Sequence, residues 1–165
     1  MSVLAIAEQR DGHYRKVTYE ALSEGRRIAD GMGTDLTALV MGSGVEGAAG
    51  ELGKYGADKI IVADHPRLAE YLTDAYTTVG AGVIAEVDPQ VVIMGASTQG
   101  KDLAARLAAS VDDRTAAVLV GPGCSTVRVM ASTSVAPSEI TGGRFALMPS
   151  WTGGAGFCTV TTGPT

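Results

Sequence analysis

The sequence predicts an α/β fold of three layers, in which helices cover both faces of a mostly parallel, doubly wound sheet. Short apolar runs alternate with segments of helical periodicity along roughly the first 120 residues. The runs are almost continuously apolar, which is typical of parallel strands buried on both faces. The chain has 22 Gly among 165 residues but only 5 Tyr, 2 Phe and 1 Trp, so we expect a core of small aliphatic side chains.

Five apolar runs are expected to form the strands. Charged or turn residues bound each run, and the segments between them are long enough for helical crossovers. Right-handed crossovers between such strands produce a doubly wound sheet. The expected strands cover residues 3–7, 36–41, 59–63, 91–94 and 116–120.

Four segments with helical spacing lie between these strands. In the first, apolar or small residues recur every three or four positions, while Arg26 and Asp30 are expected to face water. In the third, apolar residues from 68 to 87 form one stripe, and Pro66 precedes it as at many first turns. Gly56 suits a left-handed stop of the second helix. The expected helices cover residues 18–32, 47–55, 67–87 and 101–111.

The composition changes after residue 120. Residues 121–165 contain three charged side chains and are otherwise rich in Gly, Ser, Thr and Pro. Two runs, 126–132 and 144–148, are expected to add a C-terminal, hairpin-like β extension to the sheet. We expect one α/β domain over residues 1–150, followed by a Gly-rich tail over 151–165 that packs on this domain or on a partner.

Charge and apolar patterning exclude several classes of protein. The formal net charge is −5, and the sequence has no stripe of Lys and Arg of the kind that binds nucleic acid. No apolar run approaches the ~18 residues of a membrane span, and the first residues do not resemble a signal peptide. Cys124 and Cys158 form no metal-binding pattern with the two histidines. We therefore expect no metal site and two reduced thiols in a cytoplasmic protein.

The loop after the fourth apolar run carries the residues that point most directly to ligand binding. Gly95 and Gly100 flank Ser97 and Thr98, either of which can cap the next helix and leave backbone N–H groups facing a cleft. Ligands of doubly wound sheets bind beyond the carboxyl ends of the strands, where the winding reverses. If the first strand is central, this loop faces the loop that begins at Glu8.

Charged residues follow in the same helix. Asp102 is expected in its first turn, where the helix dipole favours a carboxylate, and Lys101 and Arg106 would add positive charge nearby. The pattern indicates either a phosphate cradle for AMP or ATP, or a well-capped helix with a solvated lysine. The cradle would use a loop that lacks the Walker sequence.

A second glycine pattern lies between the second and third expected strands. Gly42, Gly44 and Gly47 open the helix there, and Asp64 follows Gly42 by 22 residues. This spacing matches the dinucleotide-binding fingerprint, in which the glycines admit a pyrophosphate and the carboxylate holds a ribose hydroxyl. The alternative is a turn that needs glycine, followed by an ordinary helix.

Nucleophilic catalysis has little support in the sequence. Ser97 does not lie in a GxSxG elbow, and Cys124 has no histidine near it in the sequence. The adjacent pair Asp112 and Asp113 is best interpreted as a solvated turn. We expect no catalytic residue, and whether the chain is an enzyme stays open.

Several strings resemble the N-terminal domain of the electron-transfer flavoprotein alpha subunit. The most specific is PQVVIMGASTQGKDLAARL at 89–107, with Lys101 where that family usually has arginine. The strings VLAIAE, which ends at Glu8, and YGADKIIVAD at 55–64 are also similar to family segments. Within the first string, the residues on matching positions are Ser97, Gly100, Asp102 and Arg106.

The resemblance implies an adenine-nucleotide-hydrolase-like fold and a beta-type partner subunit of similar fold. It also implies that FAD is held mostly by a separate C-terminal domain, which these 165 residues lack, so we expect this chain alone to hold no FAD. The leading hypothesis is a scaffold and partner-docking domain of a flavin-based electron carrier, rather than a catalyst. It would form a heterodimer with the beta-type subunit, or a homodimer. The alternatives are a stand-alone AMP- or ATP-binding module and, less favoured, a NAD-binding protein that uses residues 42–64.

Overall fold

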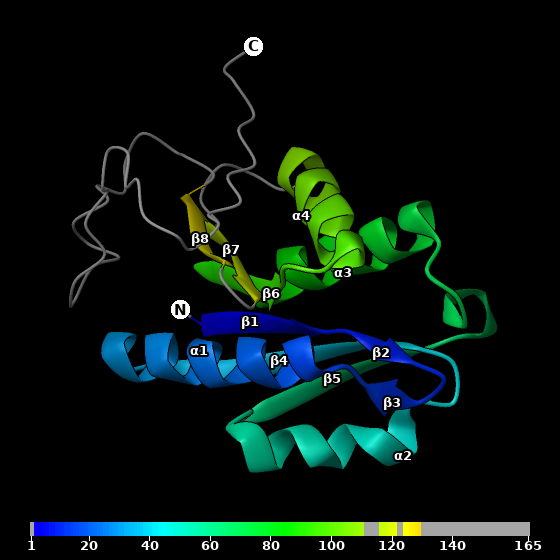
Figure 1. Ribbon diagram of the computed structural model, residues 1–165, viewed down its shortest axis with the longest axis horizontal. Helices are drawn as coiled ribbons and strands as arrows, with labels where there is room; N and C mark the ends of the chain where they lie inside the picture. Colours follow the sequence, from blue (N-terminus) through cyan, green and yellow to red (C-terminus); the bar gives the residue numbers. More distant parts are fainter. Residues whose placement is uncertain (1, 111–115, 122–123, 130–165) are drawn as a thin grey trace.

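A six-stranded sheet forms the middle layer of the fold (Figure 1). The computed structural model describes residues 2–110, 116–121 and 124–129. Across the sheet the strands are β5 (Lys59–Asp64), β4 (Asp35–Gly42), β1 (Ser2–Ala7), β6 (Val91–Gly95), β7 (Ala116–Gly121) and β8 (Cys124–Val129). The first five of these run parallel and β8 runs antiparallel to β7, so the predicted mostly parallel, doubly wound sheet is confirmed.

Helices cover the two faces of the sheet, as Figure 1 shows. One face is covered by α1 (Lys16–Met32), α2 (Glu46–Ala49) and the 3-10 helix η1 (Gly50–Tyr55). The other is covered by the 3-10 helix η2 (Pro66–Leu68), α3 (Thr73–Val87) and α4 (Thr98–Ser110). The predicted three layers are therefore confirmed.

The core has two halves, one on each face of the sheet. Side chains of β1 alternate between them: Val3 and Ala5 face α1, whereas Leu4 and Ile6 face α3 and α4. All four are at most 5% exposed, as expected for a parallel strand with neighbours on both sides. Both halves consist mainly of Val, Ile, Leu and Ala, with Tyr76 as the buried aromatic residue of the described chain.

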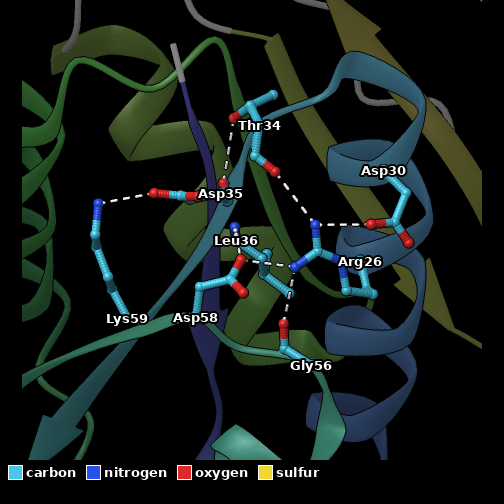
Figure 2. A network of polar contacts seen from close by, with 8 residues as sticks. All are labelled: Arg26, Asp30, Thr34, Asp35, Leu36, Gly56, Asp58 and Lys59. Carbon is cyan, nitrogen blue, oxygen red and sulfur yellow. Dashed lines mark hydrogen bonds and ion pairs between the residues drawn. The ribbon is translucent and has the colours of Figure 1, made fainter.

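The first helix is tied to the amino-terminal edge of the sheet by Arg26, which the sequence analysis had expected to face water. Its side chain is only 28% exposed. The guanidinium donates to Asp58 Oδ2 at 2.6 Å and to the carbonyls of Gly56 at 3.3 Å and Thr34 at 3.2 Å (Figure 2). The Leu36 N–H also donates to Asp58 at 2.8 Å, and these two donors lower the pKa of the Asp58 carboxyl.

A short hairpin after β1 is absent from the sequence-based expectation. It pairs β2 (Gln9–Arg10) with β3 (His13–Tyr14) in antiparallel fashion. Asp11 and Gly12 form its turn with φ of 53° and 77°, the pair of positive values that a two-residue I′ turn requires. Asp-Gly is the usual sequence of such a turn, but strands of two residues are too short to show a period of two.

The helix expected at 67–87 is the main error in the sequence-based assignment. The structure has η2 at Pro66–Leu68 and begins α3 only at Thr73. Leu68 is 3% exposed and packs into the core from the 3-10 turn, whereas Leu72 is 54% exposed. The apolar stripe thus contains residues that are buried from two separate elements, and spacing alone could not distinguish them.

Other boundaries differ by smaller amounts. The helix expected at 47–55 begins at Glu46 and becomes 3-10 from Gly50, and Gly56 ends it with φ of 99°, as predicted. The helix expected at 101–111 begins at Thr98, since the loop before it already supplies its cap. Residue 111 lies outside the described residues.

The expected C-terminal extension is found in part. Within the described residues, β8 adds an antiparallel strand at the edge of the sheet, where residues 126–132 were predicted. It pairs with β7, and the predicted run at 144–148 lies outside the described residues. The predicted tail at 151–165 and the pair Asp112 and Asp113 also lie outside them.

Candidate functional site

The carboxyl ends of β1 and β6 form a crevice near the middle of the sheet. After β1 the chain turns through the hairpin into α1 on one face, whereas after β6 it enters α4 on the other. Ligands of doubly wound sheets usually bind at such a switch point. The loops at 8–15 and 95–97 meet there, as predicted, because Ser97 contacts Glu8.

The carboxylate of Glu8 lies in this crevice, and the residue is 6% exposed. Its Oε1 accepts a hydrogen bond from Arg15 Nη1 at 2.5 Å, and its Oε2 accepts one from Ser97 Oγ at 2.5 Å. The backbone of Glu8 is also fixed, because its N–H donates to Thr18 Oγ1 at 2.8 Å and its carbonyl accepts from that hydroxyl at 2.7 Å. A buried carboxylate is tolerated when each oxygen has a partner of this kind.

Ser97 caps the amino terminus of α4. Its Oγ accepts from the Gly100 N–H at 2.9 Å, so Ser97 is the cap and Thr98 is the first helical residue. The two glycines of this loop permit close packing. A Cβ at Gly100 would lie 1.9 Å from the Gly95 carbonyl oxygen, and one at Gly95 would lie 2.7 Å from the Val17 side chain.

The crevice is nearly filled by its own side chains. The free volume of the crevice is about 10 Å³, which is room for about one water molecule. Pockets for small-molecule ligands usually enclose about 300–1,000 Å³. Apolar side chains make up most of the walls of the crevice. The lining residues are Ile6, Ala7, Glu8, Met41, Tyr76, Met94, Gly95, Gln99, Gly100 and Leu103.

Two charged residues of the predicted site point elsewhere. Asp102 lies in the second turn of α4, not the first, and accepts from Tyr71 Oη at 2.7 Å and Thr73 Oγ1 at 3.2 Å. Arg106 pairs with Asp102 at 3.6 Å and with Asp74 at 3.7 Å. These contacts hold the start of α3 against α4. They do not bring the guanidinium to the crevice.

The tyrosine contact changes the acidity of both partners. Burial, and then its hydrogen bond to Asp102, raises the pKa of Tyr71 to about 12. The same hydroxyl is the main cause of the lowered pKa of the Asp102 carboxyl. Lys101, by contrast, is half-buried, and its ammonium makes no ion pair with a described residue.

The second glycine pattern is also occupied by a side chain of the protein. Asp64 Oδ1 accepts from the Gly44 N–H at 2.9 Å, and Oδ2 accepts from the Val45 N–H at 2.8 Å. These backbone bonds lower the pKa of the Asp64 carboxyl. In the dinucleotide-binding fingerprint, this carboxylate would bind a ribose and the amides of the loop would bind a pyrophosphate. Here the carboxylate binds those amides instead. The helix α2 that follows the loop has only four residues.

The sequence analysis missed several residues that shape the crevice. Gln9 Nε2 donates to the Met41 carbonyl at 3.2 Å, while its Oε1 accepts from the Gly12 N–H at 3.1 Å. The Asp-Gly turn could have indicated this hairpin contact. No local sequence pattern marks Arg15 and Thr18, because only the folded chain brings them to their partner Glu8.

Two absences apply to the described part of the chain. Over residues 2–110, 116–121 and 124–129, no group of three or more His, Cys, Asp or Glu side chains could hold a metal ion. No helix in the same ranges combines the length and apolar character that crossing a membrane requires.

Comparison with known proteins identifies one family. The model of the family described as "Electron transfer flavoprotein domain" matches residues 3–132. The chain is 46% identical over 107 residues to "Acryloyl-CoA reductase electron transfer subunit beta" of Anaerotignum propionicum, which covers 65% of this chain and 29% of that protein. It is 43% identical over 108 residues to "Electron transfer flavoprotein subunit alpha" of Bacillus subtilis, and this match covers 65% of this chain and 32% of that protein.

A longer match is to "Electron transfer flavoprotein subunit alpha" of Syntrophomonas wolfei, with 38% identity over 141 residues, 82% of this chain and 43% of that protein. The chain thus spans well under half the length of these curated relatives. Among solved structures, a universal stress protein in complex with cAMP has a TM-score of 0.50 at 13% identity, covering 72% of this chain and 95% of that one. This likeness supports the adenine-nucleotide-hydrolase-like fold.

Proposed function

The chain belongs to the electron transfer flavoprotein domain family, and on that premise we propose that it is an alpha-type domain that serves as a scaffold and partner-docking part of a flavin-based electron carrier. The observation that carries the proposal is the family match over residues 3–132. Relatives named as alpha subunits of electron transfer flavoproteins match the same part of the chain. The partner that we propose is a beta-type subunit of such a carrier.

We propose that FAD, which supplies the redox chemistry of such carriers, is held by other parts of the assembly. The residues at the crevice do not fit a flavin nucleotide. The free space is about 10 Å³, and the Glu8 carboxylate would face the phosphates. Like charges brought together in a buried site are strongly unfavourable. The part played by this chain is accordingly shape and docking, and we derive no redox step through its residues.

The docking proposal is tested by mixing the purified chain with the beta-type subunit encoded in the same genome. We expect a complex of one copy of each in light scattering coupled to size exclusion, and no flavin absorbance in the chain purified alone. Absence of any complex would contradict docking to a beta-type subunit. Stoichiometric FAD in the lone chain would contradict the proposed location of the cofactor.

The nucleotide-binding alternatives are tested by calorimetry with AMP, ATP, NAD and FAD. The scaffold proposal predicts no tight binding of any of them. Tight AMP or ATP binding that Lys101→Ala abolishes, and that the matched change Lys54→Ala on exposed η1 leaves intact, would favour the nucleotide module. NAD binding lost in Gly44→Val would favour the fingerprint at residues 42–64.

A further inference from the structure

We propose that the crevice between β1 and β6 is an oxyanion site that the chain fills with its own Glu8. The inference rests on the geometry of the crevice and not on the proposed function. The ligand class is a carboxylate, and the ligand in the native chain is a side chain. The site would be closed to external anions for as long as Glu8 occupies it.

The first observation is the completeness of the carboxylate's binding. Glu8 is 6% exposed, and each of its two carboxylate oxygens has one donor at 2.5 Å, one from a guanidinium and one from a hydroxyl. Arg15 and Ser97 thus donate hydrogen bonds to this carboxylate in the way that anion-binding groups donate them to a bound ligand. The Ser97 hydroxyl also caps α4, so the anion is linked to the positive end of a 13-residue helix.

The second observation is that the other glycine loop also holds a carboxylate of the chain, although Asp64 is exposed and its donors are backbone amides. There the Asp64 carboxylate accepts from the amides of Gly44 and Val45. Successive backbone N–H groups of this kind are typical anion-binding concavities. Both loops that could receive an external phosphate therefore hold an internal carboxylate, one delivered from the end of β1 and one from the end of β5.

The third observation is the shape of the crevice beside Glu8. Only about 10 Å³ of free space remains there, so the carboxylate fills the position that a bound oxyanion would take. Removing the Glu8 side chain beyond Cβ would leave Arg15 and the Ser97 hydroxyl facing an enlarged cavity without an acceptor. An external anion that replaces the carboxylate would give the part-buried Ser97 hydroxyl and the largely exposed Arg15 guanidinium an acceptor again, and so would stabilise the fold.

The test is chemical rescue of Glu8→Ala by acetate. The substitution removes a CH₂–COO⁻ group, which has the same heavy atoms as acetate. We expect Glu8→Ala to be less stable than the native chain in chloride buffer, and to be stabilised saturably by acetate at constant ionic strength. At an acetate concentration ten times its dissociation constant, the unfolding equilibrium constant should fall about 11-fold.

Matched variants separate binding at the crevice from a general effect of the salt. Glu46→Ala, which removes an exposed carboxylate from α2, should show no acetate response. Glu8→Gln fills the same space, so it should be destabilised without responding to acetate. Adding Arg15→Ala to Glu8→Ala should abolish the rescue. If Glu8→Ala does not fold in chloride, the yield of folded protein after refolding in acetate against chloride gives the same comparison.

Three results would overturn the proposal. One is the absence of saturable rescue of Glu8→Ala, by stability or by refolding yield. Another is an equal acetate response in Glu46→Ala or in the Arg15 double variant. The last is saturable stabilisation of the native chain by inorganic phosphate that Arg15→Ala removes, because the crevice would then be open to external anions.

Discussion

At the scale of single residues, the contact between Glu8 and Ser97 joins two segments that lie far apart in the sequence. Both residues, and the approach of their two loops, were predictable from the sequence, because a switch point follows from strand order. The pairing of Arg15 with Glu8 was not predicted, because Arg15 lies at the surface, with 55% of its side chain exposed, and nothing near it in the sequence marks a buried partner. Which donors reach a buried carboxylate depends on hairpin geometry, and no local pattern encodes that geometry.

Ser97→Ala should therefore cost more than the loss of an ordinary cap. The change removes the bond to the Gly100 N–H and also one of the two donors to the Glu8 carboxylate. We expect the free energy of unfolding to fall by about 2–3 kcal/mol, measured by urea denaturation. Ser110→Ala is the matched control on the same helix. Among the described residues its hydroxyl binds the Arg106 carbonyl of its own helix, and the change should alter stability by less than about 0.5 kcal/mol. Equal effects of the two changes would contradict this account.

At the scale of elements, local patterns predicted buried strands better than helix ends. Every expected parallel strand is present, because a short, almost continuously apolar run bounded by charged or turn residues has few alternatives. The helix expected at 67–87 was wrong, because Leu68 and Tyr76 are buried from different elements that share one apolar spacing. The hydroxyl of Tyr71 binds Asp102 on α4 just before α3 begins, a tertiary contact that single-helix periodicity cannot include.

The junction of β6 and α4 gives a prediction at this scale. Strand end and helix start approach so closely that a Cβ at Gly100 would overlap the Gly95 carbonyl oxygen. Since that oxygen belongs to the backbone, Gly100→Ala should lower the free energy of unfolding by about 3 kcal/mol or more. Gly82 lies at an exposed position of α3, and a Cβ there would have nothing within 4 Å, so Gly82→Ala should raise stability by about 0.5–1 kcal/mol. Thermal denaturation of both variants tests this, and a well-tolerated Gly100→Ala would show that the loop can move away.

At the scale of the whole molecule, carboxylates with lowered pKa values lie at both ends of the parallel strands. Asp58 lies at their amino-terminal ends, and Asp64 and Asp102 lie toward their carboxyl-terminal ends. A carboxyl group whose pKa is lower in the folded state contributes stability above its unfolded pKa of about 3.9. That contribution is lost as the pH falls through the folded pKa.

Asp58→Asn tests this acid dependence. The N–H of Leu36 and then the guanidinium of Arg26 lower the pKa of Asp58, so the native chain should lose stability more steeply than the variant as the pH falls below about 4. The stability difference between the two proteins should be largest near neutral pH and should shrink in acid. Urea denaturation across this pH range measures it. If the difference in the free energy of unfolding between the two proteins is the same at pH 7 and in acid, then the charge of Asp58 does not contribute to the stability of the fold.

The place of β1 in the sheet has a consequence for how the chain is made. This strand is synthesised before both of its neighbours, which come from Asp35–Val40 and Val91–Met94. A nascent chain leaving the ribosome must hold Val3 to Ala7 without their final partners until most of the domain has emerged. Chaperones that protect apolar strands therefore have a longer opportunity to bind β1 than to bind either of its neighbours. A central strand of the finished protein thus stays exposed until both of the strands that enclose it have been made.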